Sequence, residues 1–209
     1  MYIYWFRIDP VVPWLGKTLF ILMNCILNMN TRAPGIAIHM GSIEPVAEKL
    51  MEEEHEFLQV PCPEAVFVGL KRWWFTKELY DSAPYRLHCR KLAKAAAEIA
   101  KKYHDNGYRI AIVGLSLSPT SGVFYVQSDP SWGGKPFDVG LSPPVARGRG
   151  VFIEELEKAL EEMGIPYSKH EIPPALIYPR YRVPELPEHS SNPEKALEQT
   201  IRIFEGKDQ

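Results

Sequence analysis

The regular alternation of short apolar segments with longer amphipathic ones is the strongest constraint on the fold. Short apolar runs bounded by loop residues are typical of buried strands, whereas the longer segments carry apolar residues at helical spacing. Strands are predicted at 18–24, 57–60, 108–114 and 165–172, and helices at about 42–52, 82–104, 151–163 and 192–204. This order predicts an α/β, Rossmann-like three-layer fold with a short, mostly parallel sheet.

The length of 209 residues favours a single domain over 1–209. We expect an α/β core at 18–172, an N-terminal arm at 1–17, and a C-terminal wrapping tail with a terminal helix at 173–209. The tail is rich in proline but offers Ile177, Tyr178 and Tyr181 for burial. The arm is rich in aromatic residues, which favours packing on the body or on a second copy, so a homodimer is expected.

Charge and cysteine content exclude several classes of protein. Lys plus Arg is 24 and Asp plus Glu is 26, for a net charge of −2, so general nucleic-acid binding is not expected. Charged residues interrupt the apolar opening, and we therefore predict no signal or membrane segment. Three cysteines cannot form a closed disulfide framework, which favours a reducing, cytoplasmic location.

Three segments that carry thiol, carboxylate or hydroxyl side chains follow the first three predicted strands, at 24–28, 60–64 and 114–122. In an open parallel sheet, ligands bind outside the carboxyl ends of the strands, where the strand order reverses. We therefore expect Cys25, Cys62, Glu64 and a serine-rich turn to meet in one crevice. Trp73 and Trp74 lie nearby in the sequence, and either stacking on a base or simple packing would account for them.

These segments read LMNCILNMNTR at 22–32, VPCPE at 60–64 and SPTSG at 118–122. In order and spacing they resemble the motifs of the 2-thiouracil desulfurase family, which read approximately ACLLG with a following Arg, CPE and SPSCG. The segment RGRGVFIEEL at 147–156 is similar to the family as well, and the likeness is greatest to an archaeal branch. The resemblance spans about residues 18–122.

The resemblance implies a [4Fe-4S] cluster held by three cysteines, with one iron open to the sulfur of a thiolated nucleobase or another small sulfur compound. Carried over by motif, Cys25 and Cys62 are two cluster ligands. The resemblance assigns Glu64 as the acid/base group and Ser118 as a catalytic residue in the substrate loop. We also expect Asn28, Arg32 and Gly122, which lie in the same strand-end segments and crevice loops, to contact the substrate.

The third ligand position departs from the family, because Ser121 stands where its motif has cysteine. A hydroxyl is a poorer ligand than a thiolate for iron–sulfur clusters. Cys89 is the other candidate, but its place in the predicted helix puts it about 10 Å from the helix start.

Two further interpretations stay open. One is a cluster-free descendant that binds a small anionic or nucleotide-like ligand, or a protein partner, in the same crevice. The other is thiol chemistry, with Cys62 as nucleophile and Cys25 as resolving partner.

Overall fold

In a computed structural model of the chain, residues 17–52, 56–136, 142–177 and 192–206 are described. A four-stranded parallel sheet forms the centre, in the order β2-β1-β3-β6. The strands are β1 (Thr18–Leu22), β2 (Glu56–Gln59), β3 (Arg109–Leu115) and β6 (Tyr167–Ile172). All five residues of β1 are buried because both faces of the sheet are covered, which explains its unbroken apolar sequence.

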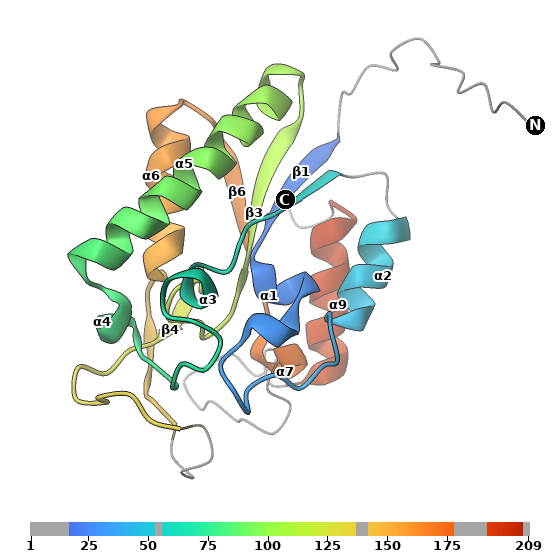
Figure 1. The fold of residues 1–209 in the computed structure, drawn as a ribbon. Coiled ribbons are helices and arrows are strands. Elements are labelled where there is room, and N and C mark those ends of the chain that lie inside the picture. Colours follow the sequence, from blue (N-terminus) through green and yellow to red (C-terminus); the bar gives the residue numbers. More distant parts are fainter. Residues whose placement is uncertain (1–16, 53–55, 137–141, 178–191, 207–209) are drawn as a thin grey trace, which may run out of the picture.

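Two helical layers cover the sheet (Figure 1). The helices α5 (Ala83–Asp105) and α6 (Val151–Glu162) lie on one face, and α2 (Glu44–Glu52) and α9 (Pro193–Phe204) lie on the other. This arrangement confirms the predicted α/β fold with three layers. The predicted terminal helix is present as α9 and packs on the body: the ring of Phe204 is fully buried, with its centroid 5.0 Å from that of Phe20.

Several short elements lie in segments that were predicted as loops. They are α1 (Asn24–Leu27), the 3₁₀ helix η1 (Met29–Thr31), α3 (Pro63–Phe67), α4 (Lys77–Tyr80) and α7 (Pro174–Ile177). A separate antiparallel pair, β4 (Tyr125–Gln127) and β5 (Val145–Arg147), lies within the predicted long loop at 116–150. Elements of three to five residues are too short to show a periodic pattern.

Two of the sequence predictions fall outside the described residues. They are the N-terminal arm, with the homodimer contact expected from it, and the part of the tail that contains Tyr178 and Tyr181. Within the described ranges, no helix combines the length and the apolar character needed to cross a membrane.

Candidate functional site

The sheet order β2-β1-β3-β6 runs outward from β1 in both directions, so the order of the strands reverses between β1 and β3. Ligands in open parallel sheets bind beside the carboxyl ends of the strands at such a point. Cys25 lies in the first turn of α1, directly after β1. Cys62 follows β2 and precedes α3, and its sulfur accepts a hydrogen bond of 3.4 Å from the amide of Ala65. The serine-rich turn follows β3. Cys25, Glu64 and Ser118, one from each segment, line one crevice, whereas Cys62 and Ser121 are not among its lining residues.

The two motif thiols both lie beside Thr31: its Oγ1 is 3.9 Å from the Cys25 sulfur, and its carbonyl oxygen is 4.0 Å from the Cys62 sulfur. The Cys62 thiol hydrogen-bonds the Cys25 sulfur, and this bond, against the opposing effect of burial, lowers the pKa of Cys25. The guanidinium of Arg32 acts in the same direction. For Cys62, the same bond and burial both raise the pKa. Cys25 is thus the more acidic thiol of the pair.

Glu64 is held by three donors from three different segments. Its Oε2 accepts hydrogen bonds of 2.9 Å from Arg72 Nε and 2.9 Å from the Tyr80 hydroxyl. Its Oε1 accepts a bond of 2.6 Å from the Thr120 hydroxyl. These bonds fix the orientation of the carboxylate beside the thiol pair, because both of its oxygens are engaged.

Arg72 ties this carboxylate to the loop that follows β1. Its side chain is only 2% exposed, and its Nη2 donates a bond of 2.8 Å to the carbonyl of Thr31. Burial opposes its charged form, but the neighbouring Glu64 outweighs burial and raises the pKa of Arg72. Burial and the charge of Glu64 raise the pKa of Tyr80, so its phenol remains protonated. Both groups therefore stay hydrogen-bond donors.

The turn after β3 is organised by Ser118. Its Oγ accepts bonds from the amides of Thr120 (3.4 Å) and Ser121 (3.0 Å). Gly122 packs so closely that a Cβ there would lie 2.3 Å from the carbonyl oxygen of Tyr125. Gly122 therefore has a packing role, whatever it contributes to binding.

Glu171 of β6 anchors the same turn from the other side. One of its carboxylate oxygens accepts bonds from the amides of Val123 (2.7 Å) and Phe124 (2.8 Å). Burial raises the pKa of this carboxyl. Nothing in the local sequence marks Glu171, because its partners lie almost fifty positions away.

The third ligand position carries an oxygen donor. Ser121 is nearly buried, and its hydroxyl lies 3.4 Å from that of Thr120, which bonds Glu64. Cys89 is fully buried in α5, where burial raises the pKa of its thiol to about 12. Within the part of the chain that the structure describes, no three His, Cys, Asp or Glu side chains are placed to hold a metal ion. At the three motif positions, the donor groups are therefore the thiols of Cys25 and Cys62 and the hydroxyl of Ser121.

Two of the residues expected at the substrate take part in hydrogen bonds with backbone carbonyl groups. The carbonyl of Asn28 accepts a bond of 2.9 Å from the Thr31 hydroxyl. Arg32 is buried, and its Nη1 donates a bond of 3.4 Å to the carbonyl of Ile36. Arg32 lines the crevice, whereas Asn28 is not among the lining residues.

The crevice itself is narrow and has a wider hollow beside it. Its volume is about 40 Å³, and polar groups from all three strand-end segments line it, namely Cys25, Arg32, Glu64, Arg72, Ser118 and Gln127. A neighbouring hollow of about 400 Å³ shares Arg72, Trp73 and Trp74 with it. Trp73 is 56% exposed at this boundary, whereas Trp74 is buried.

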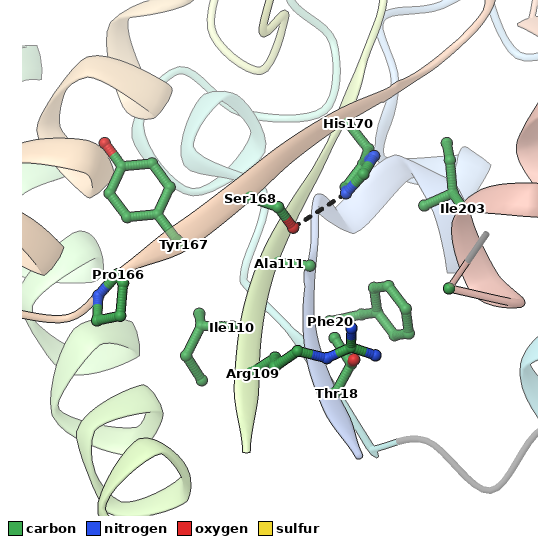
Figure 2. A pocket seen from close by; sticks show the side chains of 11 residues that line it. Thr18, Phe20, Arg109, Ile110, Ala111, Pro166, Tyr167, Ser168, His170 and Ile203 are labelled. Atoms are coloured by element: carbon green, nitrogen blue, oxygen red, sulfur yellow. Dashed lines mark hydrogen bonds between the residues drawn. The ribbon is translucent and has the colours of Figure 1, made fainter. Parts of the chain in front are cut away.

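Another hollow, of about 360 Å³, lies where β1 and β3 begin (Figure 2). It is lined by Thr18 and Arg109, the first residues of those strands, and by Ser168 and His170, which form a hydrogen bond of 3.0 Å. The thiols lie at the opposite ends of these strands, so this hollow is separate from the candidate site.

Comparisons with known proteins give two similarities. No protein-family model matches the chain. The chain is 28% identical over 150 residues to the uncharacterized protein MJ0003 of Methanocaldococcus jannaschii, covering 72% of this chain and 82% of that protein. Among solved structures, it is similar to a [4Fe-4S]-dependent thiouracil desulfidase, TudS, with a TM-score of 0.40 and 18% identity. That match covers 73% of this chain and 91% of the other.

Proposed function

We propose that the chain is a desulfurase-like enzyme that acts on a thiolated nucleobase or another small sulfur compound in the crevice at the ends of β1 and β3. The observation that carries the proposal is that Cys25 and Cys62 both lie beside Thr31, next to a carboxylate fixed by three donors. The order and spacing of the three strand-end motifs support the same reaction class.

Within this proposal, Cys25 and Cys62 would hold an iron–sulfur cluster, with Ser121 at the third position. When bound, a [4Fe-4S] cluster supplies an open iron that acts as a Lewis acid toward a soft thiocarbonyl sulfur. The hydrogen bond from the Ala65 amide to the Cys62 sulfur would help to stabilise a thiolate at that ligand.

Glu64 and Ser118 would serve the proton transfers. Replacement of the sulfur in a C=S group by the oxygen of water forms C=O and releases H₂S, so two protons must pass from water to the departing sulfur. The Glu64 carboxylate, fixed at both oxygens, would accept a proton from water and return it to sulfide. Because the Ser118 Oγ accepts bonds from two amides, its hydroxyl hydrogen can be donated to a ligand in the crevice.

The test is iron and sulfide analysis after reconstitution without oxygen, followed by an assay for sulfide release from 2-thiouracil. We expect the wild-type chain to hold iron and release sulfide, Ser121→Cys to hold iron more firmly, and Cys25→Ala to lose both properties. Thr200→Cys, which places a new buried thiol in α9, is the matched control for Ser121→Cys.

Absence of iron from both the wild-type and the Ser121→Cys chains would refute the cluster. If 2-thiouracil still bound under those conditions, the cluster-free interpretation would replace it. If the ligand neither bound nor released sulfide, the proposed function would be wrong.

A further inference from the structure

Gln127 is a crevice residue that the sequence analysis did not identify. It lies at the end of β4, is 1% exposed and lines the crevice together with Cys25 and Glu64. Its backbone amide donates a bond of 3.1 Å to the carbonyl of Leu117, which fixes the strand against the turn after β3. The backbone of Gln127 is therefore fixed, and its side chain is buried among neighbouring residues.

The orientation of the Gln127 amide group follows from its partner. Trp74 Nε1 lies 2.6 Å from the Gln127 Oε1. An indole nitrogen only donates hydrogen bonds, so the side-chain oxygen must face Trp74 and the NH₂ group must face the other way. Trp74 is itself held, because its carbonyl accepts a bond of 2.7 Å from the indole of Trp132.

The NH₂ group of Gln127 is buried and has no acceptor among the described residues. A buried donor without a partner costs about 1–3 kcal/mol, so unpaired donors are rare in folded proteins. A buried donor that is fixed in direction and belongs to a residue lining a crevice has the properties of a ligand-recognition group.

We propose that Gln127 Nε2 donates a hydrogen bond to a carbonyl oxygen of the ligand, and so selects heterocycles that carry a carbonyl group in addition to the sulfur. This inference rests on the proposed function and names the substrate class within it. Thiolated bases with a carbonyl, such as 2-thiouracil, present an acceptor to this NH₂ group. Bases with an amino group at the same place, such as 2-thiocytosine, present a donor, which leaves two donors facing each other.

The discriminating measurement is the ratio of the dissociation constants of 2-thiouracil and 2-thiocytosine, determined by calorimetry on protein reconstituted without oxygen. A site built to pair with a hydrogen-bonding group rejects analogues that cannot pair. We expect the wild-type chain to bind 2-thiouracil about tenfold more tightly than 2-thiocytosine.

Two variants and a control complete the design. Gln127→Met removes the donor at similar volume and should bring the ratio close to one. In Gln127→Glu, one oxygen still accepts from Trp74 and the other faces the ligand, so the preference should invert. Gln199→Met makes the same change as Gln127→Met on α9, away from the crevice, and should keep the wild-type ratio. Circular dichroism establishes that each variant is folded.

The outcomes separate the inference from the function on which it rests. Equal binding of both bases by the wild-type chain, or an unchanged preference in Gln127→Met, would overturn the role of Gln127 and leave the proposed function in place. Failure of every chain to bind either base would overturn the proposed function and the inference with it.

Discussion

The anchoring of Glu64 by Arg72 makes a quantitative prediction about stability. The two side chains are 14% and 2% exposed and lie 2.9 Å apart, so their charges are largely shielded from water. Removal of one partner from a buried pair typically costs about 3–5 kcal/mol, since the other charge is left without compensation. We therefore expect Arg72→Met to lower the free energy of unfolding by about that amount. Tyr80→Phe, which removes one neutral donor to the carboxylate, should lower it by about 1.5–3 kcal/mol.

The assay is urea unfolding followed by circular dichroism, with a double-mutant cycle. Arg72→Met combined with Glu64→Gln should cost less than the sum of the single changes by about 2 kcal/mol, because the double variant leaves no unpaired charge. Arg202→Met is the matched control: Arg202 pairs with Glu198 on α9 with both side chains more than half exposed, so its loss should change stability by less than about 1 kcal/mol. If the losses in the free energy of unfolding add up in the double variant, or if Arg72→Met loses no more than Arg202→Met, then Arg72 does not anchor Glu64.

Three further predictions follow from other contacts. Phe204→Ala should lower the free energy of unfolding by about 3–5 kcal/mol, because the ring packs against Phe20; an effect as small as that of an exposed residue would contradict the assignment of α9 to the sheet layer. At neutral pH in protein without iron, iodoacetamide should label Cys25 before Cys89, since the pKa of Cys25 is lowered and Cys89 is buried with a pKa of about 12; equal labelling by mass spectrometry would refute this order. Glu171→Ala should speed hydrogen exchange of the two amides that it binds in the turn after β3, whereas unchanged exchange would show that Glu171 does not hold the turn.

The sheet and the main helices were predictable because their signals are local. The buried runs of β1 and β3 are unbroken apolar sequences, and α5 carries several alanines with a glycine stop after it. Strand ends in a parallel sheet share one edge, so the placement of Cys25 and Cys62 at the same edge of the sheet could also be predicted from the order of elements.

The remaining features depend on contacts between distant residues. The partners of Glu64, namely Arg72, Tyr80 and Thr120, come from three segments with no common motif. Gln127 lies in a three-residue strand whose pairing with β5 spans a long loop, so no periodicity marked it. The helix α9 was predicted from its own sequence, but its packing against Phe20 of β1 depends on residues almost two hundred positions apart.

The most direct test of the proposed function is a crystal structure determined without oxygen from protein reconstituted with iron and sulfide and soaked with 2-thiouracil. Anomalous scattering would locate iron and the ligand sulfur independently. The account predicts iron in contact with the sulfurs of Cys25 and Cys62, with the ligand sulfur beside it and Glu64 within reach. Iron absent from both thiols, or a ligand bound only in the hollow between Arg109 and His170 at the opposite ends of the strands, would contradict it.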